Sequence, residues 1–166
     1  MTLLVADATR STLSEVLDDA EAVAVDDLAA ALSAGDDRVV VVDCAAADAD
    51  SAAATVRARA PDAVVVSVGG DGGDVVAATG DEEAVSAAVA RAQTVAAYRA
   101  SVSALYEACR GRALGRPRED LRETRANADR RLAELPSDRQ TVAAALRTRD
   151  EAAGTDVNDQ RDATDG

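Results

Sequence analysis

The sequence predicts an α/β protein in which a parallel sheet of four or five strands is flanked by helices and followed by a C-terminal helical extension. Residues 39–43 (VVVVD) and 63–67 (AVVVS) are nearly pure valine, which is typical of strands buried on both faces of a parallel sheet. Strand-like and helix-like segments alternate about every twenty residues over the first half of the chain, the pattern of βαβ crossovers. The second half changes to long helices.

The first half contains the signals expected at element boundaries. The expected strands cover residues 3–6, 21–25, 38–44, 63–67 and 75–78. The helices between them are expected to begin near residues 11, 26 and 51. Pro61 ends the last of these because its ring cannot continue a helix, and Asp81 is placed to cap the next one, with Glu82 and Glu83 in its first turn. The glycine-rich GGDGGD at 69–74 lacks the lysine and hydroxyl of a phosphate-binding loop and predicts a flexible turn.

Apolar residues after position 82 recur at helical spacing. A heptad-like stripe is formed by Val95, Tyr98, Val102, Leu105 and Cys109. A helix of about thirty residues is about 45 Å long, more than a small sheet can cover, so its far half needs a partner. GRALGRP at 111–117 predicts a break, residues 121–135 predict a second helix, and Ser137 with Gln140 fits a capping box that starts a third. The result would be a helical hairpin or coiled-coil extension.

These patterns divide the chain into three parts. Residues 1–93 form the expected α/β domain and residues 94–152 the helical domain. Residues 153–166 are acidic and lack apolar periodicity, so a disordered tail is expected.

The composition is strongly acidic. There are 31 acidic residues and 18 basic residues, all arginine, for a net charge of −13, and lysine and histidine are absent. This balance favours adaptation to high salt, where screening removes self-repulsion. Two cysteines without histidine nearly exclude a zinc site. With no signal peptide and no apolar run long enough to span a bilayer, a cytoplasmic protein without membrane contact is expected.

The charge is divided unevenly between the two halves. Residues 1–97 hold 5 Arg and 18 acidic residues, whereas residues 98–152 hold 12 Arg and 9 acidic residues. Arg110, Arg112 and Arg116 flank the predicted break and could face an anion. Alternatively, such arginines pair with acids on their own helices. An acidic protein partner remains open, whereas nucleic acid is disfavoured by the overall charge and the shortage of aromatic residues.

Polar side chains follow three of the predicted strands. Asp7 follows the first strand, Asp43 ends the central one and Ser67 ends the fourth. Carboxyl ends of parallel strands meet at one edge, where open α/β folds place their ligands. Two carboxylates and a hydroxyl suit Mg²⁺ and phosphate chemistry. Asp7 and Asp43 are therefore the predicted magnesium ligands, and no other cofactor is expected.

The order of these segments resembles a response-regulator receiver domain. LLVAD at 3–7, VVVVD at 39–43 and VVVS at 64–67 look like its three functional strands. The resemblance implies a flavodoxin-like sheet, with Asp43 as the phosphoacceptor and Ser67 as the switch hydroxyl. Ala8 and Ala78 depart from the pattern, because they replace a metal-binding acid and a lysine, and residues 68–73 are too few for the usual fourth helix. These departures favour a pseudo-receiver that is not phosphorylated.

The helical part resembles the HalX domain that follows receiver domains in haloarchaeal two-component regulators. The similarity lies in YRASVSALYEACRGRA at 98–113 and LRETRANADRRLAEL at 121–135. Together the two resemblances imply a non-enzymatic regulatory protein that binds a protein partner or forms a homodimer through its C-terminal helices. The interaction would use Val95, Tyr98, Val102, Leu105, Arg110, Arg112 and Arg116. The alternative is a phosphorylatable response regulator that controls transcription through Asp43.

Overall fold

A computed structural model of the chain describes residues 2–5, 13, 17, 20–34, 39–45, 49–115 and 121–147. The strands are β1 (Thr2–Val5), β2 (Ala20–Val23), β3 (Val39–Asp43), β4 (Val64–Val68) and β5 (Val75–Ala77). The helices are α2 (Val25–Ala34), α3 (Ala49–Arg59), α4 (Glu82–Ala113), α5 (Leu121–Ala133) and α6 (Arg139–Leu146). Of the expected helix after residue 11, the structure describes only Leu13 and Leu17, which are joined by a hydrogen bond from the N–H of Leu17 to the carbonyl of Leu13 at 3.0 Å. The expected tail at 153–166 lies outside the described residues.

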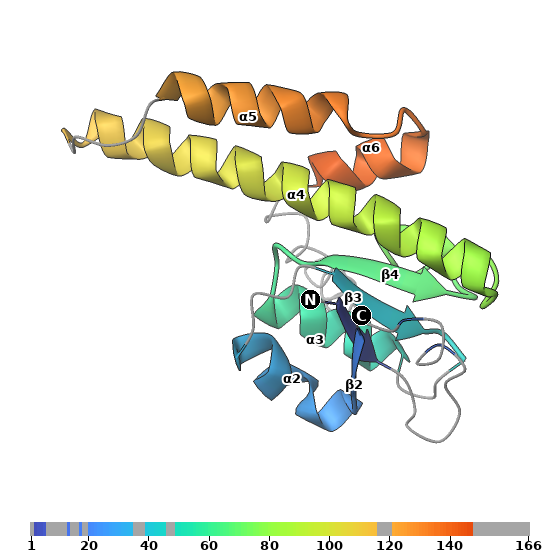
Figure 1. Ribbon diagram of the computed structural model, residues 1–166. Helices are drawn as coiled ribbons and strands as arrows, with labels where there is room; N and C mark the ends of the chain where they lie inside the picture. Colours follow the sequence, from blue (N-terminus) through green and yellow to red (C-terminus); the bar gives the residue numbers. More distant parts are fainter. Residues whose placement is uncertain are drawn as a thin grey trace, which may run out of the picture.

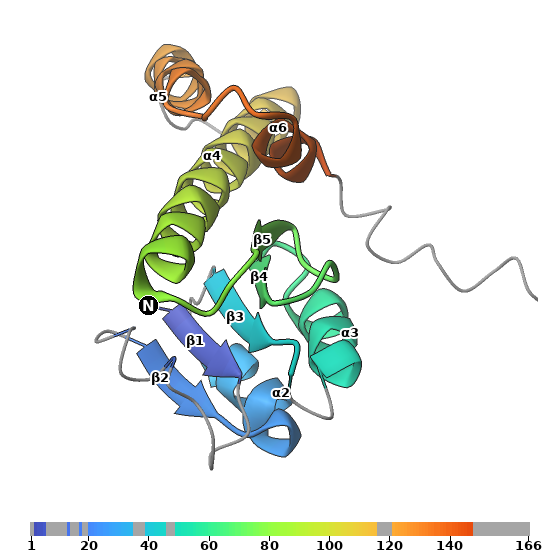
Figure 2. The same cartoon turned by 90° about the vertical axis from the view of Figure 1, so that its right-hand side faces the viewer.

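The strands form one parallel sheet in the order β2-β1-β3-β4-β5. Helices α2 and α3 cover one face, and α4 with α6 lies over the other (Figures 1 and 2). Successive side chains of β3 alternate between the two faces, so Val40 and Val42 join the cluster around Leu28, whereas Val39 and Val41 pack in the α4 cluster. The predicted α/β class with a parallel sheet flanked by helices is confirmed.

The connection between β4 and β5 is unusually short. Only residues 69–74 join these two parallel strands, and no helix lies between them. Parallel neighbours usually need a crossover of about a dozen residues or more. Here the chain turns back at once, since the N–H of Asp74 donates to the Val65 carbonyl at 2.7 Å and the N–H of Gly69 to the Ala77 carbonyl at 2.9 Å. The GGDGGD segment is therefore a turn, as predicted.

Helix α4 dominates the second half of the fold. It has 32 residues, which corresponds to about 48 Å. Asp81 is its N-cap, as expected, and accepts hydrogen bonds from the Thr79 hydroxyl and, at 2.9 Å, from the N–H of Ala84, both of which lower the pKa of its carboxyl. The first half of α4 buries Val85, Ala92 and other small side chains against the sheet. The helix continues without a break through the predicted domain boundary at 93/94.

The last two helices follow different courses. Helix α5 runs antiparallel to the far half of α4 (Figure 1), and α6 then packs against α4 and, less extensively, against β5 (Figure 2). Thr141, Ala144 and Ala145 of α6 are buried, and the two alanines join the sheet core. The predicted cap was wrong by one residue. Asp138, rather than Ser137, caps α6, because its carboxylate accepts from the N–H of Thr141 at 2.9 Å.

Replacing Asp138 tests whether α6 contributes to the stability of the whole fold. Asp138→Ala removes the cap and should lower the free energy of unfolding by about 1 kcal/mol, whereas Asp138→Asn, which also caps, should change it little. Hydrogen bonds from Thr141 lower the pKa of Asp138. The pKa of this carboxyl is lower in the folded state than in the unfolded state, where it is near 3.8. The carboxylate therefore stabilises the fold at pH values above 3.8, and this stabilisation is lost as the pH falls through the folded-state pKa. Urea unfolding in molar KCl at pH 7 and pH 3 measures both effects. Equal stability of the alanine and asparagine variants at pH 7 would contradict this account.

Two adjacent glycines test the tight turn between β4 and β5. A Cβ at Gly73 would lie 2.6 Å from the Ser67 nitrogen and 2.9 Å from the Val65 carbonyl oxygen, whereas one at Gly72 meets nothing within 4 Å. Gly73→Ala should therefore cost about 2 kcal/mol, because backbone atoms have to move. Gly72→Ala is the matched control and should stay within about 0.5 kcal/mol of wild type. Chemical unfolding of both variants in the same salt measures their free energies of unfolding. A similar loss of stability in both would contradict the close packing of Gly73 against the backbone of Ser67 and Val65.

Candidate functional site

Asp43 ends the central strand at the carboxyl edge of the sheet, as predicted. Its side chain is half-buried, and one carboxylate oxygen accepts a hydrogen bond from the N–H of Ala45 at 2.9 Å. This bond closes a turn of the kind that aspartate commonly makes with the backbone two residues on. The carboxylate thus already has a structural role in the chain reversal after β3.

The sheet register separates Ser67 from Asp43. Asp43 lies opposite Val68, and Ser67 lies opposite Val42. Because side chains alternate along a strand, an offset of one residue places Asp43 and Ser67 on opposite faces of the sheet. The Ser67 hydroxyl is buried and donates to the carbonyl of Gly70 at 2.7 Å. The structure therefore does not bring these two predicted site residues together on one face.

The remaining predicted features of this edge are only partly described. Asp7 lies outside the described residues, so the magnesium site at Asp7 and Asp43 stays a prediction. In the part of the chain that the structure describes, no group of three or more Cys, Asp or Glu side chains is placed to hold a metal ion. Ala78, at the expected lysine position, is exposed just after β5.

A cavity that the sequence did not predict lies beside β3 and β4 on the α3 face. It has a volume of about 340 Å³, and its polar lining includes Cys44, Asp50, Ser67 and Asp71. Burial raises the pKa of the Cys44 thiol, and the Asp43 carboxylate raises it further, with smaller contributions from Asp50 and Asp71. The thiol is therefore protonated at neutral pH and a weak nucleophile. Two carboxylates on the wall also oppose binding of a phosphate group.

The strongest polar cluster of the described chain is centred on Asp74 at the end of the β4–β5 turn. The Asp74 carboxylate is 7% exposed and accepts from the N–H of Val65 at 3.0 Å. Its other oxygen pairs with Arg147 after α6 and lies 3.8 Å from a terminal nitrogen of Arg99 on α4. The cluster thus joins the turn of the sheet to two helices of the C-terminal half.

Arg99 extends this network to the backbone. Its guanidinium donates to the carbonyl of Ala63 at 3.2 Å and, through Nε, to the carbonyl of Ala144 near the end of α6, also at 3.2 Å. Burial is the main cause that lowers the pKa of Arg99, the charge of Arg147 lowers it further, and the Asp74 carboxylate acts in the opposite direction. Asp74 therefore offsets part of the cost of burying the guanidinium.

The apolar stripe predicted on α4 divides into two parts. Val95 is buried in the core and Tyr98 packs partly against it. Beyond the sheet, Val102 is 40% exposed, Leu105 is half-buried and Cys109 is exposed. The predicted stripe is therefore buried in the core at its Val95 end and exposed to solvent at its Cys109 end.

The contact between α4 and α5 is built from small residues. Ser101 and Ala108 of α4 and Ala128 of α5 are buried, while larger apolar side chains of the same region point outward. Tyr106 is 66% exposed and Leu132 is 53% exposed. We call residues 98–113 and 121–133 the helical hairpin. Its exposed surface thus carries a few large apolar side chains among charged ones.

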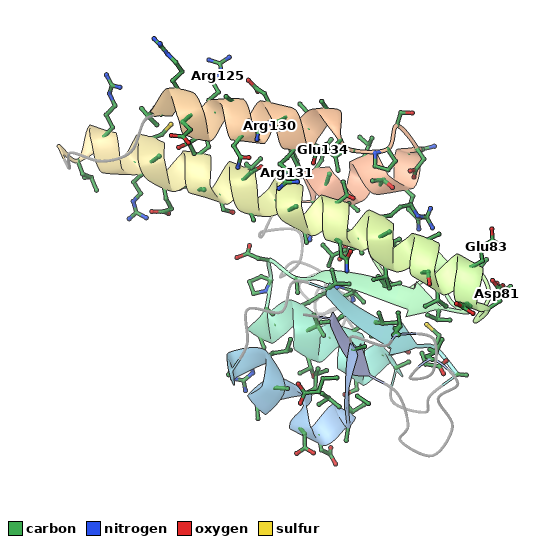
Figure 3. The ribbon with its side chains drawn as sticks, in the orientation of Figure 1. Asp81, Glu83, Arg125, Arg130, Arg131 and Glu134 are labelled. Atoms are coloured by element: carbon green, nitrogen blue, oxygen red, sulfur yellow. The ribbon has the colours of Figure 1, made fainter. Side chains whose placement is uncertain are left out.

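Arginines on the hairpin partly pair with acids of their own helix. Arg110 lies 3.9 Å from Glu107, and Arg125 lies 3.8 Å from Asp129. Such exposed pairs contribute only tenths of a kcal/mol each. Figure 3 shows Arg125 pointing away from α4, with Asp81 and Glu83 at the opposite end of that helix.

The predicted arginine cluster is only partly described. Arg112 is exposed in the last turn of α4, close to Arg110 in sequence, and Arg116 lies outside the described residues. The expected pairing with acids on the same helix therefore applies to Arg110. The role of the cluster in binding an anion stays a prediction.

Comparisons with known proteins give no relative for this chain: no protein-family model, curated protein or solved structure matches it. None of the helices that the structure describes combines the length and apolar character needed to cross a membrane.

Neutralising Asp74 tests the network that joins the sheet to the C-terminal helices. Asp74→Asn keeps the shape and an acceptor for Val65 but leaves Arg99 buried without its carboxylate, so the free energy of unfolding should fall by about 3 kcal/mol. Asp71→Asn, on an exposed carboxylate of the same turn, is the control and should change it by less than about 0.5 kcal/mol. Urea unfolding in molar KCl compares them. Equal stability of the two variants would show that Asp74 does not hold the helices in place.

Proposed function

We propose that this chain is a regulatory signalling protein, a pseudo-receiver whose helical hairpin mediates association with another protein. The observation that carries the proposal is the arrangement of the hairpin. Its helices extend beyond the sheet (Figure 1), and α5 packs chiefly on α4. Val102, Tyr106 and Leu132 are left on the surface, and exposed apolar groups of this kind are typical of protein interaction sites.

The sheet supports the receiver-like part of the proposal. The strand order β2-β1-β3-β4-β5 is the common order of flavodoxin-like doubly wound sheets, to which receiver domains belong. The absence of a helix between β4 and β5 and the alanine at position 78 favour a domain without phosphoryl chemistry. The hydrogen bond of Ser67 to Gly70 and its offset from Asp43 favour the same reading.

Charge complementarity favours one partner surface. Apart from the largely buried Arg99, the helical hairpin contains 6 Arg against 3 acidic residues, whereas residues 1–97 contain 5 Arg against 18 acidic residues. A basic, partly apolar hairpin therefore matches the acidic α/β domain of a second copy of this chain. We infer self-association in which the hairpin of one copy contacts the α/β domain of another. A homodimer formed hairpin to hairpin has no such complementarity.

Two valines with the same exposure provide a matched test of this association. Val102 on the hairpin and Val142 on α6 are each 40% exposed. Val102→Ser should weaken self-association about tenfold, the effect of a loss of about 1.4 kcal/mol, while Val142→Ser should leave it unchanged. Light scattering and sedimentation over a range of protein concentrations, in KCl where the fold is intact, measure the association. A monomer at every concentration, or equal weakening by both variants, would exclude this interface.

The second candidate is a phosphorylatable response regulator that controls transcription, with Asp43 as phosphoacceptor and Mg²⁺ held by Asp7 and Asp43. It is favoured by the position of Asp43 at the carboxyl end of the central strand. Incubation with acetyl phosphate and Mg²⁺, followed by intact-mass measurement, separates the two candidates. We expect no added phosphoryl group. A phosphoryl adduct on wild type that is missing from Asp43→Asn would replace the pseudo-receiver proposal with this one.

A further inference from the structure

A small second cavity lies beside the Asp74 network. It has a volume of about 20 Å³ and is lined by the side chains of Arg57 on α3, Arg99 on α4 and Arg147 after α6, together with Asp74. A cavity of this size holds one water-sized or monatomic species. Three arginines that are far apart in sequence, on α3, on α4 and just after α6, thus line a single small site.

The charges around this cavity are unbalanced. Three guanidinium groups line it, and Asp74 is the carboxylate among its lining residues. Asp62, an exposed residue next to Pro61, also acts on Arg99, but the charge of Arg147 acts on Arg99 in the opposite direction. Even when both aspartates are counted, positive charge exceeds negative charge. Because part of the site is buried, water screens this excess incompletely.

Two of the arginines also have more N–H donors than the bonds that they make to the protein. Arg57 donates through one terminal nitrogen to the carbonyl of Gly72 at 2.6 Å, and Arg147 uses one terminal nitrogen for its pair with Asp74. A guanidinium carries five N–H donors, so each of these groups has further donors beyond that bond. Arg99, in contrast, donates to both Ala63 and Ala144.

We propose that this cavity binds a single halide ion, chloride in a chloride medium, between Arg57 and Arg147. A monatomic anion supplies the missing negative charge and can accept from several N–H donors at once, and it matches the small volume better than sulfate, phosphate or a carboxylate ligand does. The ion connects α3, on one face of the sheet, with the end of α6 on the other side. Chloride thereby stabilises the docking of the C-terminal helix. This inference does not depend on the proposed function.

Bromide is the direct probe, because it has a similar size and gives an anomalous X-ray signal. Crystals of the full chain grown in KBr should show an anomalous peak in the cavity, within hydrogen-bond distance of the Arg57 and Arg147 guanidiniums. A water molecule without anomalous signal at that position would overturn the proposal.

Solution measurements test the same site through stability. The thermal midpoint of wild type should be about 3 °C higher in KCl than in potassium acetate of equal ionic strength, if chloride is about tenfold above half-saturation. Arg57→Gln should lose this chloride-specific difference. Arg59→Gln, on an exposed arginine of the same helix, is the control and should keep it. A difference in Arg57→Gln equal to that of wild type would overturn the proposal, even if that variant is less stable overall.

Discussion

The contacts of the buried Asp74 carboxylate join the sheet to the C-terminal helices, and the arrangement of these two halves of the chain depends on them. One of its oxygens accepts from the backbone of β4, and the other faces the guanidiniums of Arg99 and Arg147. A buried charge is costly unless it is paired and hydrogen-bonded. The sheet, α4 and the end of α6 must therefore all be in place before this group is satisfied. The short β4–β5 turn puts Asp74 at that position, and the tight contact at Gly73 fixes the turn.

The composition of the core explains why such a network matters. The chain has no Phe or Trp, and its buried side chains are mostly valine and alanine with a few leucines. Small side chains let α4 approach the sheet closely, but each buries little apolar area, so hydrophobic stabilisation per residue is modest. Polar contacts between elements then carry a larger share of the net stability. The same use of small residues between α4 and α5 leaves Tyr106 and Leu132 outside, where they are available to a partner.

The proposed function rests on the same division of the molecule. Asp43 lies at the carboxyl end of the central strand, but the sheet register places Asp43 and Ser67 on opposite faces. The helical hairpin, in contrast, combines exposed apolar groups with a positive charge opposite in sign to that of the α/β domain. These features favour a role in association over a role in phosphoryl transfer. The proposed binding of chloride in the cavity beside Asp74 would make the docking of α6 depend on the anion in solution.

The sequence by itself determined the elements, because their signals are local. Runs of valine predict buried parallel strands, Asp81 marks the start of α4, and helical spacing predicts the long helix. Only the tertiary structure decided which of these residues meet. Arg147 is 73 positions from Asp74, and no local pattern links them. Helical spacing placed Val95 and Val102 on one stripe, but the length of the sheet decides that one is buried and the other exposed. The register of β3 against β4 offsets Asp43 from Ser67 by one residue. Because side chains alternate between the faces of a sheet, this offset places the two side chains on opposite faces.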